Sequence, residues 1–150
     1  MKPETILYKQ HTANYNQVFT HLVKCDDYFI PKLSEKTDIA AYSYKIIKNS
    51  VTFEAWANDE LTGLIAAYFN DEQNKTGFIT NVSILNKFSG KGIASELLKQ
   101  CIAYGRENNF REIRLEVSVK NDSAVKLYEK NNFIQVENKN DLLVMKINLK

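Results

Sequence analysis

The chain has 150 residues, the length of one domain (1–150) with a hydrophobic core of its own. Its formal net charge of +2 gives no electrostatic reason to expect nucleic acid or a membrane surface as a partner. Because no apolar run reaches about 18 residues and Met1–Gln10 lacks the apolar stretch of a signal peptide, we expect a cytoplasmic protein that does not span a membrane.

The cysteines and histidines predict neither a disulfide framework nor a metal site. Cys25 and Cys101 form no CxxC pair, and we expect both to be reduced, buried thiols. We expect His11 and His21 at the surface or in helix caps rather than as metal ligands.

The first half of the chain predicts a strand, two helices and then a hairpin of strands. Apolar residues recur at helical spacing after Asn14, and this helix should end before Pro31, because the residue preceding a proline disfavours helical geometry. The other expected elements, in chain order, are the strand Ile6–Lys9, the helix Asp38–Lys48 and the strands Val51–Trp56 and Leu61–Phe69, joined by a turn at residues 58–60.

The second half predicts strands that alternate with helices. In chain order we expect the strand Thr76–Leu85, the helix Gly92–Asn108, the strand Glu112–Val119, the helix Asn121–Asn131 and a closing hairpin of Phe133–Val136 and Leu142–Leu149. The strand Thr76–Leu85 and the strand Glu112–Val119, with the helix between them, form a βαβ unit. Such units are parallel and right-handed almost without exception, so the loop after Thr76–Leu85 lies at the sheet edge where open α/β sheets bind ligands.

That loop, Ser89–Ala94, reads S-G-K-G-I-A and leads directly into the strongest helical pattern. A helix N-terminus has unpaired N–H groups and a positive dipole end, and glycines let a phosphate approach them closely. Gly90, Gly92 and Ala94 have no bulk to obstruct that approach, and Lys91 adds charge or faces solvent. The alternative is a turn that needs glycine only for its geometry. The loop is neither a P-loop nor G-x-G-x-x-G.

A second motif lies about 30 residues further along, in the helix Asn121–Asn131. The chain resembles the GCN5-related N-acetyltransferase (GNAT) family over nearly its whole length. The family pattern Q/R-x-x-G-x-G/A aligns with Ser89–Ala94, where Ser89 replaces the usual Gln or Arg. The pattern N-x-x-A-x-x-L-Y-x-K-x-G-F aligns with matching residues Asn121, Ala124, Leu127, Tyr128, Lys130 and Phe133, with Asn132 at the glycine position. Because Asn adopts the left-handed conformation more readily than other non-glycine residues, this replacement puts little in doubt.

The resemblance implies an α/β (α+β) GNAT fold: a mixed, mostly antiparallel sheet of about 6–7 strands around the parallel βαβ unit, with helices on both faces. It also implies an acetyl-CoA-dependent N-acetyltransferase without a metal. The implied cofactor-binding residues are the backbone near Val82 and Ile84 for the pantetheine arm, and Ser89, Gly90, Lys91, Gly92, Ile93 and Ala94 for the pyrophosphate. Asn121 would contact the pantetheine arm, cap its own helix, or both.

The resemblance makes Tyr128 the general acid for the departing CoA thiolate. A phenol of pKa ~10 facing a thiol of pKa ~8.5 makes full proton transfer uphill by roughly 2 kcal/mol in water. We therefore expect Tyr128 to act mainly as a hydrogen-bond donor to the sulfur. The alternative is a tyrosine that only packs in the core beside Ala124 and Leu127.

Glu116 is the candidate general base, acting through water. In the ribosomal-protein N-terminal acetyltransferases of this family, a glutamate at the same offset in a similar L-E-V-x-x-x-N context is the base. The alternative for Glu116 is a strand glutamate paired with Arg114 or Lys120, and Glu54 is the fallback base. A backbone N–H near Asn81 or Val82, where the family often has a β-bulge, would polarise the thioester carbonyl.

The segments that line the acceptor cleft in this family correspond here to residues 25–36 and 137–141. The candidate substrate-binding residues are Asp26, Asp27, Tyr28, Phe29 and Asn81. Carboxylates and aromatic rings suit a cationic amine, and they equally suit a solvated loop. Two other classes of function are compatible with the sequence: a non-catalytic acyl-CoA-binding or regulatory module, and a protein whose glycine loop holds a nucleotide. A homodimer is common in the family.

Overall fold

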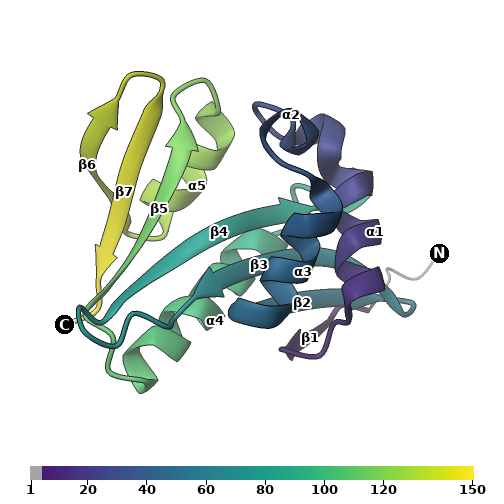
Figure 1. The fold of residues 1–150 in the computed structure, drawn as a ribbon, viewed down its shortest axis with the longest axis horizontal. Coiled ribbons are helices and arrows are strands. Elements are labelled where there is room, and N and C mark those ends of the chain that lie inside the picture. The colour runs from purple at the N-terminus through teal and green to yellow at the C-terminus, as the bar shows by residue number, and fades with distance from the viewer. Residues whose placement is uncertain (1–4) are drawn as a thin grey trace.

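The computed structural model describes residues 5–150; the first four residues of the Met1–Gln10 segment lie outside the described part. Over residues 5–150 the strands form one sheet of seven, in the order β1-β2-β3-β4-β5-β7-β6 (Figure 1). The strands are β1 (Leu7–Gln10), β2 (Val51–Ala57), β3 (Glu60–Tyr68), β4 (Thr76–Ile84), β5 (Glu112–Ser118), β6 (Ile134–Lys139) and β7 (Leu142–Asn148). The helices are α1 (Tyr15–Cys25), α2 (Leu33–Lys36), α3 (Ile39–Asn49), α4 (Ile93–Glu107) and α5 (Asp122–Lys130).

The sheet is mixed, as predicted, and its one parallel pair is β4 with β5. These two strands pair only at their first residues, Thr76–Phe78 with Glu112–Arg114. Beyond them the strands diverge, and Figure 1 shows the two halves of the sheet opening like a V. The prediction of a mixed sheet around a central parallel βαβ unit is therefore confirmed.

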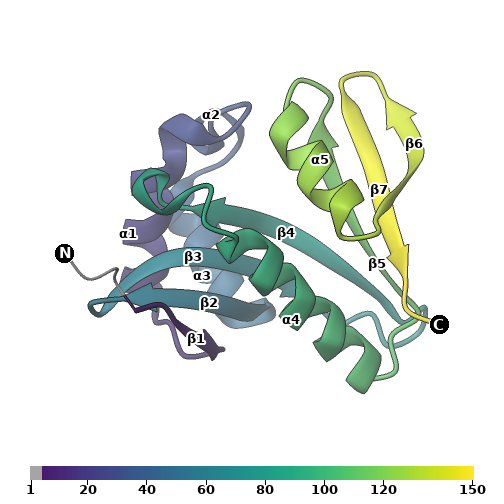
Figure 2. The same cartoon turned by 180° about the vertical axis from the view of Figure 1, so that it is seen from behind.

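Helices cover both faces of the sheet. Helices α1 and α3 pack on one face of β2–β4, whereas α4 and α5 lie on the other, as Figures 1 and 2 show from opposite sides. The core between α4 and the sheet includes Leu97 and Ile102 from the predicted helical stripe, together with Ile113, Leu115 and Val117 of β5. The alternating strand pattern predicted for β5 is thus buried on the α4 side.

Helix α1 ends before Pro31, as predicted. It ends at Cys25, and a 3₁₀ turn at Asp26–Tyr28 and the short helix α2 occupy the segment up to residue 36. The Asp26 carboxylate accepts hydrogen bonds from the backbone N–H of Ser34 (2.8 Å) and from its hydroxyl (2.6 Å). This pairing folds the segment back on itself, a tertiary constraint that helical spacing does not encode.

The cysteines match their prediction, and one histidine does not. Cys25 and Cys101 are free and buried, and burial raises the pKa of both thiols. His11 is exposed, but His21 is buried with an exposed fraction of 2%. The expectation of a surface or capping His21 is therefore wrong, because its ring packs between α1 and β3 with both nitrogens hydrogen-bonded.

The described residues contain neither a membrane-spanning helix nor a cluster of potential metal ligands. Within residues 5–150, the helices are all too short or too polar to cross a lipid bilayer. In the same residues, no three His, Cys, Asp or Glu side chains gather closely enough to hold a metal ion.

Candidate active site

A cleft of about 410 Å³ lies where β4 and β5 diverge. It brings together six residues that the sequence singled out from separate segments: Phe29, Asn81, Val82, Glu116, Asn121 and Tyr128. Its other lining residues are Ile30, Pro31, Leu33, Lys36, Thr37, Tyr42, Phe78, Ile79, Thr80, Val117, Ser118 and Leu142. The cleft is therefore the candidate active site.

Tyr128 lies on α5 at the wall of this cleft. Its side chain is 7% exposed, and its ring packs against Phe133 at 5.9 Å between centroids. Burial alone raises the pKa of Tyr128. The phenol therefore stays protonated through the physiological range and can act as a hydrogen-bond donor, while complete transfer of its proton is harder than in water.

Glu116 reaches the cleft from β5. Leu115 and Val117 face the core against α4, so strand alternation directs Glu116 to the opposite face, which carries α1 and α3. The pairing with Arg114 that we considered as an alternative does not form, because Arg114 is bonded to Glu112. Among the described residues no ion pair involves Glu116, which leaves its carboxylate available to a ligand in the cleft.

The edge of β4 that faces the cleft has unpaired backbone groups. The N–H of Leu85 donates to Thr62 of β3 at 2.8 Å, so Leu85 and the residues in phase with it face β3. Backbone groups alternate between the two edges of a strand. The N–H and C=O groups of Val82 and Ile84 therefore face the gap toward β5, where an extended ligand can bind them as an additional strand would.

A bulge interrupts β4 just before this edge. Ala66 pairs with Asn81 and Ala67 with Ile79, so Thr80 is the extra residue. The predicted bulge near Asn81 or Val82 is present one residue earlier. The hydroxyl of Tyr42 donates to the Thr80 carbonyl at 2.7 Å, which anchors the bulge to α3. Burial raises the pKa of Tyr42 to about 12.

The glycine loop precedes α4 at the same end of β4. Gly90 and Gly92 have φ of +75° and +81°, in the left-handed region that favours glycine. Gly92 is the N-cap of α4 and makes no side-chain capping bond, and a Cβ placed at either glycine meets nothing within 4 Å. Open space, uncapped N–H groups and the nearby Lys91 are compatible with a phosphate group, and phosphate binding by this loop stays a prediction.

Asn121 caps α5, with its side-chain oxygen accepting from the N–H of Ala124 at 3.2 Å. The structure therefore confirms helix capping, one of the two roles predicted for Asn121. Because Asn121 also lines the cleft, contact with a ligand stays a prediction.

At the acceptor end, the structure brings Phe29 into the cleft and leaves three of its neighbours outside. Asp26 is bonded to Ser34, Asp27 forms an ion pair with Lys32 at 3.1 Å, and Tyr28 is 60% exposed. The loop 137–141 also does not line the cleft, because β6 continues to Lys139 and the hairpin contributes Leu142 instead.

The predicted segment 25–36 does line the cleft, but through the apolar residues Ile30, Pro31 and Leu33, which sequence reasoning did not single out. Sequence reasoning also missed Tyr42. An apolar run in an otherwise polar loop was the available signal. Exposed apolar residues in such a segment favour a ligand contact over ordinary solvation.

Glu54, the fallback base, stabilises the fold instead. It is fully buried on β2, and its two oxygens accept from the hydroxyls of Thr12 and Thr52, from the N–H groups of Thr12 and Ala13, and from the Trp56 indole. Burial raises the pKa of Glu54, but these hydrogen bonds outweigh it and the net pKa is lowered. Glu54 therefore ties residues 12–13 to the sheet and lies away from the cleft.

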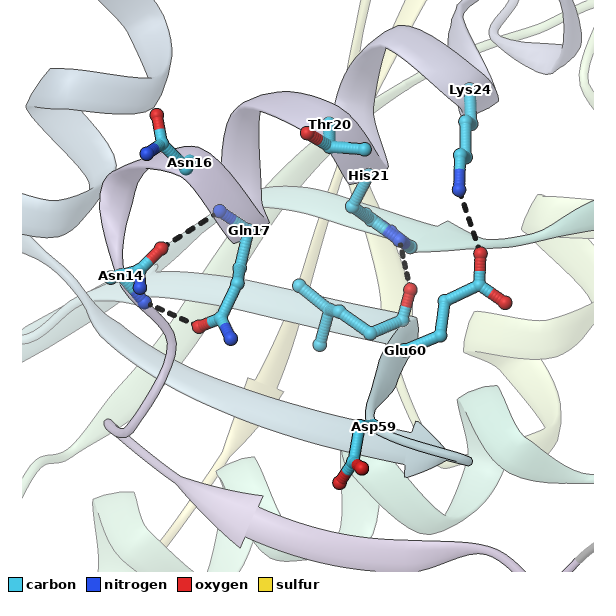
Figure 3. A pocket seen from close by; sticks show the side chains of 9 residues that line it. Asn14, Asn16, Gln17, Thr20, His21, Lys24, Asp59 and Glu60 are labelled. Atoms are coloured by element: carbon cyan, nitrogen blue, oxygen red, sulfur yellow. Dashed lines mark hydrogen bonds and ion pairs between the residues drawn. The ribbon is translucent and has the colours of Figure 1, made fainter.

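A second cavity of about 370 Å³ lies beside α1 (Figure 3). The polar side chains around it are largely paired with one another: Asn14 with Gln17 in a capping box, and Lys24 with Glu60 at 2.7 Å. The ring of His21 donates to the Leu61 carbonyl at 3.0 Å. With these groups satisfied within the protein, this cavity is a weaker candidate than the cleft.

A family model described as "Acetyltransferase (GNAT) family" matches residues 16–133. The chain belongs to this family. The matched range includes the β4 edge, the glycine loop, Glu116 and Tyr128, so the geometry of the cleft and the family pattern coincide.

Relatives and solved structures agree with this assignment. N-alpha-acetyltransferase MAK3 of Arabidopsis thaliana is 31% identical over 108 residues, which are 71% of this chain and 57% of the relative. N-alpha-acetyltransferase 30 of Xenopus laevis is 32% identical over 107 residues, 69% of this chain and 39% of that protein. The PaiA N-acetyltransferase of Thermoplasma acidophilum in complex with coenzyme A superposes with a TM-score of 0.80 at 14% identity, over 96% of this GNAT chain and 99% of that chain.

The sequence relatives and the solved structure support different conclusions about this chain. The chain spans 57% and 39% of the lengths of the two curated relatives. The structural match, at 14% identity, shows the GNAT fold alone.

Proposed function

We propose that the chain is an acetyl-CoA-dependent N-acetyltransferase that acts by direct attack of a primary amine on the thioester. The observation that carries the proposal is the cleft between β4 and β5, which collects Glu116, Tyr128 and the free edge of β4 in one cavity. Membership of the GNAT family supports the same activity.

The residues present fit acetyl-CoA. The open glycine loop at Gly90–Ala94 would hold the pyrophosphate, and the unpaired backbone groups of Val82 and Ile84 would hold the pantetheine arm. When bound, acetyl-CoA supplies an activated acetyl group. The N–H of Val82 faces the gap and would donate to the carbonyl oxygen of that group.

The proposed roles of the side chains follow from their surroundings. Tyr128, kept protonated by burial, donates a hydrogen bond to the departing sulfur. Glu116 accepts a proton from the amine, directly or through water. An α-amino group of pKa near ~8 costs about 1 kcal/mol to deprotonate at pH 7, against about 4.6 kcal/mol for a lysine-like amine. The free energy of deprotonation that Glu116 has to help supply is therefore much smaller for an α-amine.

We propose an α-amino group beside an apolar side chain as the acceptor. The acceptor end of the cleft has an apolar wall of Phe29, Ile30 and Leu33, and among its lining residues the charged ones are Glu116 and Lys36. A single carboxylate is a poor match for a polyamine. The names of the relatives, N-alpha-acetyltransferases, favour the α-amine of a peptide over a small amine. The two buried free cysteines favour a reducing, cytoplasmic location.

The test is release of free thiol from acetyl-CoA. The acceptors are a lysine-free peptide with a free, apolar first residue, the same peptide with a blocked N-terminus, a polyamine, an amino sugar and free amino acids. We expect turnover with the free peptide and none with its blocked counterpart. Saturating acetyl-CoA at about 100 times its Kd should stabilise the fold by about 2.7 kcal/mol.

The results separate the alternatives. Thermal stabilisation by acetyl-CoA without turnover of any amine would favour the non-catalytic acyl-CoA-binding module. Stabilisation by a nucleotide and not by acetyl-CoA would favour the nucleotide-binding alternative and overturn the proposal.

A further inference from the structure

The short helix α2 turns one side toward the cleft, and that side carries a lysine. Leu33, Lys36 and Thr37 line the cleft, whereas Ser34 and Glu35 do not. Positions i, i+3 and i+4 lie on one side of a helix. The side of α2 that borders the cleft therefore changes from apolar to cationic within one turn. Figures 1 and 2 show α2 across the opening of the V from β5 and β7.

The acidic side chains of the same segment do not line the cleft. The Asp26 carboxylate accepts hydrogen bonds from the backbone N–H and the hydroxyl of Ser34, at 2.8 and 2.6 Å, and this brace fixes which side of α2 borders the cleft. Asp27 is paired with Lys32 at 3.1 Å. Glu35 lies on the side of α2 that the cleft does not include. The segment therefore contributes a single positive charge to the cleft, and no negative one.

Lys36 has no carboxylate partner within residues 5–150. The ion pairs of the described residues involve neither Lys36 nor Glu116, so the two charges are not paired with each other. They are the charged residues that line the cleft, and they come from α2 and from β5. The cleft therefore offers a ligand one anion and one cation on separate elements. A ligand with both a cationic amine and an anion matches this arrangement.

The order of groups along α2 indicates where the anion of such a ligand lies. The apolar wall around Leu33 suits the first side chain of the proposed acceptor. Three positions further along a helix, the Cβ atom of Lys36 is about 5–6 Å from that of Leu33. An extended peptide advances about 3.3 Å per residue. The part of a peptide that lies beside Lys36 is therefore one or two residues beyond the part beside Leu33.

We propose that Lys36 is a specificity-determining residue that binds a carboxylate carried by the acceptor one or two residues after its α-amine. The preferred acceptor is a peptide with an apolar first residue and an Asp or Glu at the second or third position. The C-terminal carboxylate of a dipeptide presents the same group at a similar distance. A basic side chain there is repelled by Lys36. The inference rests on the proposed function for the acceptor amine and adds the charge of the neighbouring residue.

The test compares matched acceptors in the thiol-release assay. Lysine-free, C-terminally amidated hexapeptides with an apolar first residue carry Asp, Asn or Arg at the second or the third position. A dipeptide with a free or an amidated C-terminus distinguishes the terminal carboxylate from a side chain. We expect kcat/KM about threefold higher for the Asp than for the Asn peptide, the size typical of a partly solvated charge pair. The preference should shrink as salt is added, because ions screen such a pair.

Variants of the two lysines of this segment assign the preference to one side chain. Lys36→Gln should bring the ratio of kcat/KM for the Asp and Asn peptides to about one, and Lys36→Glu should favour the Arg peptide instead. Lys32→Gln is the matched control, because Lys32 is also exposed but does not line the cleft. It should keep the wild-type ratio. An equal change in the Lys32 and Lys36 variants would refute the assignment, since the effect would then come from surface charge in general.

The proposed function and this inference fail in different ways. If the wild-type protein turns over none of the peptides, the proposed function has failed, and the inference fails with it. If it turns over the Asp, Asn and Arg peptides equally at both positions, and the two dipeptides equally, only the inference is overturned. A preference for a carboxylate that survives in Lys36→Gln would likewise overturn the role of Lys36 and leave the proposed function intact.

Discussion

Tyr128→Phe removes one hydroxyl at the wall of the cleft, and the structure sets the size of each expected effect. The ring contact with Phe133 is kept, and among the described residues burial alone, with no hydrogen bond, acts on the hydroxyl. The free energy of unfolding should therefore change by less than about 1 kcal/mol. The lost donor to the departing sulfur should lower kcat about 100-fold, equivalent to about 2.7 kcal/mol of transition-state stabilisation.

The assay is thiol release from acetyl-CoA with the best amine of the panel, alongside thermal unfolding with and without acetyl-CoA. Tyr104→Phe is the matched control, because Tyr104 packs against Phe53 and Phe69 away from the cleft. We expect kcat to fall only in Tyr128→Phe, with the acetyl-CoA stabilisation unchanged. Since burial raises the pKa of Tyr128, the wild-type profile should show no basic limb from this residue below about pH 10. A kcat within threefold of wild type would refute the donor role, and an equal loss of acetyl-CoA binding would make Tyr128 structural.

Three further perturbations test other parts of the structure. Gly92→Glu places bulk and negative charge at a φ of +81° and should abolish stabilisation by acetyl-CoA; Gly92→Asn, which tolerates this φ, should retain it in the same thermal assay. Glu116→Gln should lower kcat about 100-fold for a lysine-like amine and much less for an α-amine; equal losses would argue against a base. Glu54→Gln should lower the free energy of unfolding by about 3 kcal/mol at pH 7 in denaturant titrations. Because the folded-state pKa of Glu54 is lowered, this stabilisation is present above the ordinary carboxyl pKa and lost as pH falls through the folded value, so variant and wild type should converge in acid.

Local patterns predicted most of the fold. The alternation around Leu115 and the helical stripe containing Leu97 each depend on one face being buried, and the structure buries them as predicted. The glycine loop was equally accessible, because the positive φ of Gly90 and Gly92 follows from a local conformational need that few other residues meet. Tyr128 and Glu116 come together in the cleft because family motifs place them on adjacent elements.

The missed features all depend on contacts between distant segments. The sequence alone suggests that Asp26 is a free carboxylate, because it does not show the hydrogen bond from Ser34. It likewise suggests that Glu54 is an available base, because it does not show the hydrogen bonds from residues 12–13. The burial of His21 depends on Ser83, 62 positions away. Side-chain pairing over such separations has no periodicity, so hydropathy patterns cannot reveal it.

The divergence of β4 from β5 is both a cost to the fold and the source of its binding site. Pairing stops after Phe78, and the backbone groups of Val82 and Ile84 remain without a strand partner. An unpaired backbone group in a dry core costs about 1–3 kcal/mol, so these groups need an open cleft in which water can reach them. A ligand with its own amide groups replaces that water with directed hydrogen bonds, and it gains affinity without a change in the fold. Closing the sheet further would pair these groups and strengthen the fold, but it would leave the cofactor nowhere to bind.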